Sequence, residues 1–187
     1  MELLILFFLA FLNGLLAMSE MAIVSARRTR LKALAEDGNV GASTALKLGD
    51  DPTHFLATVQ IGITLLGIIA GAFGSATLVQ PISDQLAKIE LLMPYSNTLG
   101  YALVILVTTY ISLVFGELVP KRIALNNPEG VSNLVARPMR LISRLTYPFV
   151  WLLSRSTQLI LQLLSIPKST ESAVTEEEIQ MLLRQGI

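Results

Sequence analysis

The chain has 187 residues, of which 52% are hydrophobic and 15% are charged, and its formal net charge is zero. Soluble domains carry about a quarter charged residues, so this composition indicates a membrane protein. A neutral chain gives no reason to expect a nucleic-acid partner. The sequence contains no cysteine and one histidine, His54, which excludes a disulfide framework, a thiolate metal site and a multi-histidine metal site.

Three segments are apolar enough to cross a bilayer as helices, which takes about 20 residues each. We expect these spans at about residues 3–24, 53–79 and 98–119. Asp51 and Pro52 precede the second span and are typical of an N-cap and a first helical position. The predicted fold is therefore an all-α membrane protein with three transmembrane helices.

The placement of lysine and arginine predicts the direction of the spans, because these residues concentrate in cytoplasmic loops. Of the 14 lysines and arginines, Lys88 alone lies between the second and third spans, and all the others lie on the opposite side. This pattern predicts an N-out, C-in orientation for a multi-pass protein of the inner or plasma membrane.

Two further segments are predicted to lie along the cytosolic face of the membrane. Residues 29–48 form one of them, with a turn at Asp37-Gly38. Residues 131–166 form the other, since recurring arginines suit a helix whose charged side chains reach the headgroups. A fourth span within 131–166 is the alternative, and it would put the C-terminus outside.

We place a transmembrane domain at residues 1–166 and a segment of different character at 167–187. Pro167 begins a stretch that reads as a linker. Thr175 with Glu178 three residues later is typical of a capping box that begins a short amphipathic helix. We expect this helix to lead toward a cytosolic module outside this chain.

Polar residues inside the spans are candidates for function, because polar groups are costly in hydrocarbon. Glu117 is the main candidate, about 6 Å before Lys121 along the helix axis. Glu20 and Gln60 are expected at a similar depth, and Asn13 shares the helix face of Glu20.

A local distortion of the third span would turn Glu117 toward the other spans. In a regular helix Glu117 points about 140° away from Ser112, whereas an i→i+5 turn aligns the two side chains. Gly116 and Pro120 are residues that tolerate or cause such a turn. The backbone carbonyls freed by the turn must then line a cavity or bind a ligand.

The second span carries a stripe of small and polar residues: Gln60, Thr64, Gly67, Gly71 and Gly74. Gly67 and Gly71 form a GxxxG pair that permits close helix approach, so helix packing explains the glycines without a ligand. Serines and threonines in membrane helices also often donate to their own backbone. With the two carboxylates, this oxygen-rich set suits magnesium, calcium, manganese or sodium.

Three stretches resemble the transmembrane domain of the CNNM/CorC family: "AMSEMAIVSARRTRLKAL", "TVQIGITLLGIIAGAFGS" and "VFGELVPKRIALNNPE". The segment "GELVPK", Gly116 to Lys121, is the most specific of these motifs. The resemblance implies a homodimer of three-span subunits, followed by a cytosolic CBS-pair module that binds ATP with magnesium. It also implies magnesium export coupled to sodium entry.

The resemblance further implies an ion site between the three spans. Glu117 and Gly116 match the third-span residues of that site, and Ser19 with Glu20 matches the "SE" of the bacterial pattern. Asn13 occupies a position where a small polar residue is expected in relatives.

The second-span ligand stays open, because many relatives have an "IGNN" segment where this chain has "IGIT". The candidates are the Gly62 carbonyl, Gln60 and Thr64.

We therefore expect a membrane cation transporter domain that binds and moves magnesium, with sodium as a second candidate ion. The second and third spans would rock against the first, with the glycine stripe as the sliding surface. The alternative is a dimeric anchor or regulator that positions a cytosolic sensor without moving ions; polar span residues that face different directions would favour it. An enzyme is not expected, because the spans hold no pair of aspartates for intramembrane proteolysis and His54 lies at the interface.

Overall fold

The structure of the chain is a computed structural model that describes residues 1–164. Within that range all regular elements are helices, which confirms the all-α prediction. Two compact units are present, residues 1–147 and residues 148 onward. The predicted boundary at residue 166 and the predicted helix near Thr175 lie outside the described residues and stay predictions.

Three helical segments are long and apolar enough to cross a membrane: Glu2–Ser25 (α1), Pro52–Leu86 (α4) and Met93–Asn126. Each segment contains one of the three predicted spans and extends beyond it at both ends. The spans expose large apolar side chains such as Phe8, Leu106 and Tyr110, as expected of surfaces that contact lipid.

The third span is built from four consecutive pieces. A single 3₁₀ turn, Met93–Tyr95, leads into α5 (Ser96–Leu113). A π-helical turn, Val114–Leu118, then connects α5 to α6 (Val119–Asn126). The distortion predicted around Gly116 and Pro120 is therefore present.

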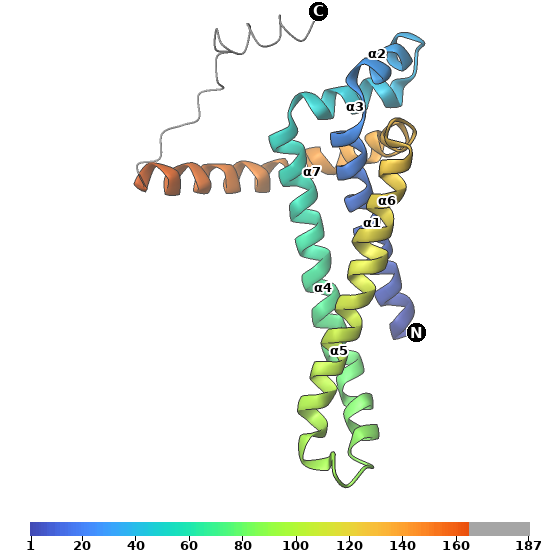
Figure 1. Cartoon of the computed structure of the whole chain (residues 1–187). Coiled ribbons are helices and arrows are strands. Elements are labelled where there is room, and N and C mark those ends of the chain that lie inside the picture. The colour runs from blue at the N-terminus through green and yellow to red at the C-terminus, as the bar shows by residue number, and fades with distance from the viewer. Residues whose placement is uncertain (165–187) are drawn as a thin grey trace, which may run out of the picture. The chain divides into compact units, whose positions relative to one another are not determined.

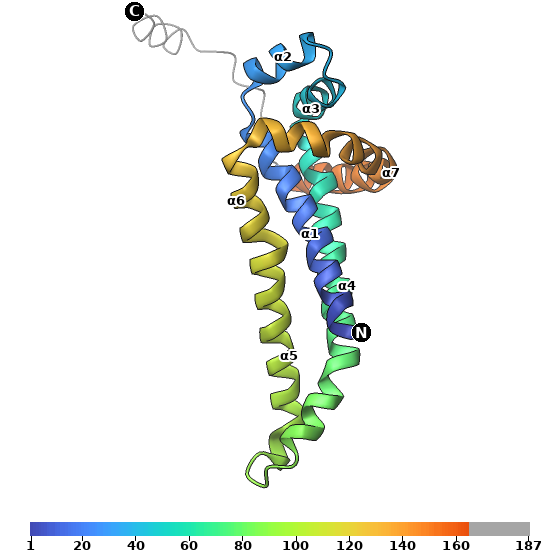
Figure 2. The same cartoon turned by 90° about the vertical axis from the view of Figure 1, so that its right-hand side faces the viewer.

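The three spans lie side by side, with α1 in contact with α4 on one side and with the π-helical turn and α6 on the other (Figures 1 and 2). α4 and α5 also pack against each other, and residues 87–95 join them at one end. The π-helical turn thus faces α1, the first span.

Two short helices connect α1 to α4. α2 (Arg28–Glu36) and α3 (Val40–Asp50) are separated by Gly38, whose φ of 85° suits a residue without a side chain. This is the turn predicted at Asp37-Gly38. Asp51 caps α4, since its Oδ1 accepts from the backbone N–H of His54 at 3.1 Å.

A single helix, α7 (Pro128–Leu163), occupies most of the segment predicted at 131–166. Its part within the first unit packs on the start of α4: His54 Nδ1 lies 3.1 Å from Ser143 Oγ, and Thr146 Oγ1 donates to Thr58 Oγ1 at 3.4 Å. α7 is not among the described helices that are apolar enough to span a membrane, because arginines, glutamines and serines recur along it. The fourth-span alternative is therefore not supported.

Candidate functional site

The site is organised by the π-helical turn in the third span. Val119 N–H donates to Val114 O, five residues earlier, instead of to the carbonyl four residues earlier. Pro120 follows directly and has no N–H, so it cannot donate to the carbonyl of Gly116. The carbonyl oxygen of Gly116 is thereby left without the donor that a regular helix would supply at that position.

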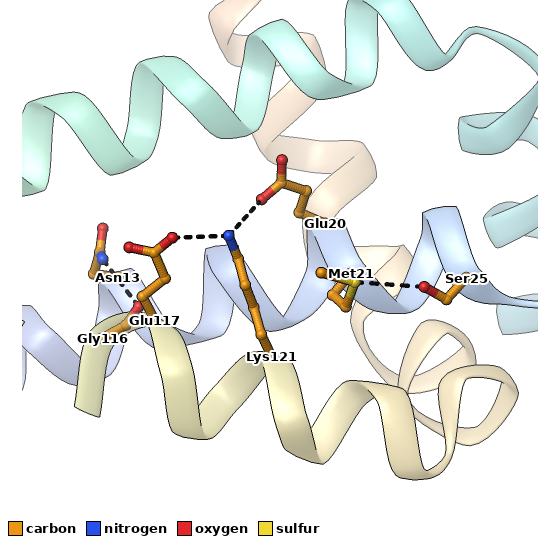
Figure 3. A network of polar contacts seen from close by, with 7 residues as sticks. All are labelled: Asn13, Glu20, Met21, Ser25, Gly116, Glu117 and Lys121. Carbon is orange, nitrogen blue, oxygen red and sulfur yellow. Dashed lines mark hydrogen bonds and ion pairs between the residues drawn. The ribbon is translucent and has the colours of Figure 1, made fainter. Parts of the chain in front are cut away.

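Asn13 of α1 supplies a donor to this carbonyl. Its Nδ2 donates to Gly116 O at 3.0 Å, across the contact between the first and third spans (Figure 3). The other end of the same amide, Asn13 Oδ1, is buried and has no hydrogen-bond partner within residues 1–164. A buried polar atom without a partner is uncommon, and here it lies beside a carbonyl in an apolar span.

The first and third spans approach closely here because Gly14 of α1 and Gly116 of the π-helical turn each face the other span. A Cβ at Gly116 would lie 3.1 Å from Asn13 Nδ2 and 3.3 Å from Ala10 O. Gly116 is buried. The absence of a side chain at this position therefore allows Asn13 to reach the backbone of the third span.

Glu117 and Glu20 meet at the ammonium of Lys121 (Figure 3). Lys121 Nζ lies 2.9 Å from Glu117 Oε1 and 3.7 Å from Glu20 Oε2. Glu117 and Lys121 are on the third span, one turn apart, whereas Glu20 comes from α1. The structure therefore brings together the two carboxylates that the sequence places at one depth, with a cation between them.

Ser19 lies apart from this group. Its hydroxyl donates to Leu15 O at 2.6 Å, one turn earlier in α1. The residue is buried against an apolar cavity that is lined by leucines of α1, Leu66 and the start of α7. Ser19 is thus one of the serines in membrane helices that donate to the backbone of their own helix.

The second-span candidates do not converge on Glu117 either. Gln60 and Thr64 are exposed, and Gln60 Nε2 reaches Thr64 Oγ1 at 3.5 Å. Gly62 faces α1, since a Cβ there would lie 2.5 Å from Leu16 Cδ1. Ser112 is half-buried on α5.

The expected glycine stripe is only partly a packing surface within this chain. A Cβ at Gly74 would lie 3.0 Å from Thr108 Cγ2, so this glycine does permit close approach to α5. At Gly67 and Gly71 a Cβ would meet nothing within 4 Å of the described part of the chain. Gly67 and Gly71 therefore do not pack closely against the first or third span in this arrangement, and their role as a sliding surface stays a prediction.

The donor set of the site is made of oxygens of several kinds. Among residues 1–164, no group of three or more His, Cys, Asp or Glu side chains is close enough to hold a metal ion. The oxygens that do lie near one another are two carboxylates, the Gly116 carbonyl and the Asn13 amide. Such hard oxygens suit Mg²⁺ or Na⁺ better than a transition metal.

The family to which the chain belongs follows from comparison with known sequences. The family described as "CNNM: Cyclin M transmembrane N-terminal domain" matches residues 3–187. The chain belongs to this family. The resemblance seen in the three motifs above is thereby confirmed.

Relatives of this CNNM domain include UPF0053 proteins and polyamine export proteins. The UPF0053 protein sll0260 of Synechocystis is 49% identical over 186 residues, which are 100% of this chain and 42% of the relative. The polyamine export protein of Salmonella typhimurium is 29% identical over 182 residues, 97% of this chain and 40% of the relative. The polyamine export protein of Escherichia coli K12 is 27% identical over 174 residues, which are 93% of this chain and 39% of the relative. The chain thus spans about two fifths of the length of these relatives, as a multi-pass membrane domain.

Lys121 is the residue of this CNNM domain whose part in the site is not predicted from the sequence. Its position indicates only a positive charge at the end of the third span. The spacing itself held a signal, because residues four apart on a helix are neighbours and Glu117 precedes Lys121 by four. The contact with Glu20 depends on the approach of α1 and has no local signature.

Proposed function

We propose that this chain is the membrane domain of a cation transporter and that Mg²⁺ is its cargo, exported against sodium entry. The observation that carries the proposal is the π-helical turn, which holds Glu117, packs on α1 and brings the Gly116 carbonyl to Asn13 inside an apolar span. Ionisable residues and irregular backbone at such depth are expected where ions pass.

The donor set supports a small hard cation as cargo. Mg²⁺ prefers oxygen ligands and gives up water reluctantly, so several protein oxygens must replace its hydration shell. Glu117, Glu20 and the unpartnered Asn13 Oδ1 are the groups proposed for this task, together with the Gly116 carbonyl. Ser19 and Gly62 would join them only after a rearrangement of α1 and α4, which a transport cycle requires in any case.

A polyamine is the second candidate cargo. Relatives from Salmonella typhimurium and Escherichia coli are named polyamine export proteins. In this chain a protonated primary amine, that of Lys121, already lies between the two carboxylates. A protonated amine group of a polyamine has the same charge and the same donors.

The orientation and the assembly also belong to the proposal. The distribution of lysine and arginine supports N-out, C-in insertion in the cell membrane. A homodimer, with a CBS-pair module after this domain, is what membership of the family leads us to expect.

The test is flux through proteoliposomes that contain the full chain. We expect Glu117→Gln to abolish Mg²⁺-dependent flux while the protein remains folded, whereas Glu36→Gln, which alters an exposed carboxylate on α2, should retain it. Spermidine flux measured in the same vesicles decides between the two cargoes. Undiminished flux of both cations in Glu117→Gln would refute the proposal, whereas no flux of either cation through the unaltered chain would favour a non-transporting anchor.

A further inference from the structure

Lys121 occupies the place where a transported cation would have to bind. Its Nζ contacts one carboxylate oxygen from the third span at 2.9 Å and one from α1 at 3.7 Å. The side chains of Lys121 and Glu20 are about three-quarters buried, with 26% and 29% exposed. Figure 3 shows the lysine rising from α6 so that its ammonium lies between the two carboxylates.

The charges of the three groups explain why the lysine stays there. Two carboxylates that contact the same ammonium are close enough to repel each other, and the repulsion is stronger in a medium of low dielectric constant. With the ammonium the three groups carry a net charge of −1, and without it the pair carries −2. Removing the cation from a partly buried pair is therefore unfavourable unless another cation replaces it.

The lysine can also leave. An ammonium on a flexible four-carbon chain can swing toward the headgroup region while its methylene groups stay against apolar surface. An ammonium has donors and no acceptor, so it cannot share a site with a metal ion. The lysine and an incoming cation therefore compete for the same carboxylate oxygens.

We propose that Lys121 is a tethered cation that holds the Glu20–Glu117 pair in the empty site, and that the transported cation must displace it. This inference rests on the proposed function. It makes Lys121 a competitor that every incoming cation must displace. A divalent ion that replaces the ammonium neutralises the pair, whereas a monovalent ion exchanges one positive charge for another. The cost of displacing the ammonium is the same for both ions, so the lysine lowers both affinities by one factor, and the −2 charge of the bare pair is what favours Mg²⁺ over Na⁺.

The first test compares Lys121→Gln with Arg122→Gln. Each variant removes one positive charge from α6, but Arg122 is exposed and makes no ion pair with any of residues 1–164. With the full chain titrated calorimetrically, we expect Lys121→Gln to bind Mg²⁺ and Na⁺ each about tenfold more tightly than the unaltered chain does, because the competing ion pair is gone. Arg122→Gln should match the unaltered chain. Equal Mg²⁺ affinities in the two variants would overturn the inference.

A second test needs no variant at Lys121 and decides the question if Lys121→Gln fails to fold. Reductive methylation of the unaltered chain, read by mass spectrometry, should modify Lys121 several-fold faster in saturating Mg²⁺ than without it. The rate at Lys47 on α3 serves as the control. An unchanged rate at Lys121, with Mg²⁺ flux that still depends on Glu117, would refute displacement and leave the proposed function standing. Loss of the Glu117 dependence would instead refute the proposed function.

Discussion

At Gly14, α1 comes so close to the third span that a side chain has no room. A Cβ at this position would lie 2.8 Å from Pro120 Cγ and 2.9 Å from Phe115 O. One of these atoms belongs to a rigid ring and the other to the backbone, so neither can move aside cheaply. Gly14 therefore sets the distance at which Asn13 can donate to Gly116.

We predict that Gly14→Ala destabilises the chain by about 1–3 kcal/mol, the usual cost of overpacking a well-packed site. Gly67→Ala is the matched control, because a Cβ there meets nothing within 4 Å of residues 1–164. Thermal unfolding in detergent measures both. Equal melting temperatures for the two variants would contradict the close approach described for α1.

At the scale of elements, the π-helical turn depends on one missing donor. Pro120 has no N–H for the carbonyl of Gly116, and Asn13 takes that place from α1. The turn also changes the direction of every side chain that follows, since one residue more or less rotates a helix face by about 100°. The position of Glu117 relative to α1 is therefore tied to Pro120.

Pro120→Ala should restore an N–H that can donate to Gly116 O and favour a regular helix. We expect Mg²⁺ affinity to fall about tenfold or more, because Asn13 loses its acceptor and Glu117 rotates away from α1. Calorimetric titration of the full chain measures this. Pro128→Ala is the control. Pro128 is the first residue of α7, where a backbone N–H has no intrahelical acceptor, so its missing N–H costs no helix hydrogen bond. Unaltered affinity in Pro120→Ala would separate the ion site from the turn.

Local features of the sequence were sufficient for the elements but not for all of the site. The three spans, the Asp51 cap and the turn at Pro120 could be predicted because each depends on residues within a few positions of one another. The role of Ser19 could not be predicted, because a serine hydroxyl in a span can either bind an ion or donate to the backbone of its own helix. In the structure it donates to Leu15 O. Lys121 could not be joined to Glu20, because that contact exists only where two separate helices meet.

At the scale of the whole first unit, the two ends of the spans differ in charge. The connection between α4 and α5, at residues 87–95, holds Lys88 as its one basic residue. The opposite end carries α2 and α3 with their lysines and arginines (Figure 1). This asymmetry is the physical basis of the proposed orientation.

The orientation can be tested directly because the chain contains no cysteine. Single variants Lys88→Cys and Lys32→Cys, exposed on opposite ends, report on the two sides of the membrane. We expect a membrane-impermeant maleimide added to intact cells to label Lys88→Cys and not Lys32→Cys, with both labelled after lysis. The reverse pattern would contradict N-out, C-in insertion.

The most direct test of the central claim is an experimental structure of the full chain in saturating Mg²⁺. We predict an ion about 2.0–2.1 Å from a Glu117 oxygen, with Gly116 O or Asn13 Oδ1 among its ligands and the Lys121 ammonium withdrawn from both carboxylates. A structure in which Lys121 still bridges Glu117 and Glu20, with no ion between α1 and the π-helical turn, would contradict the account.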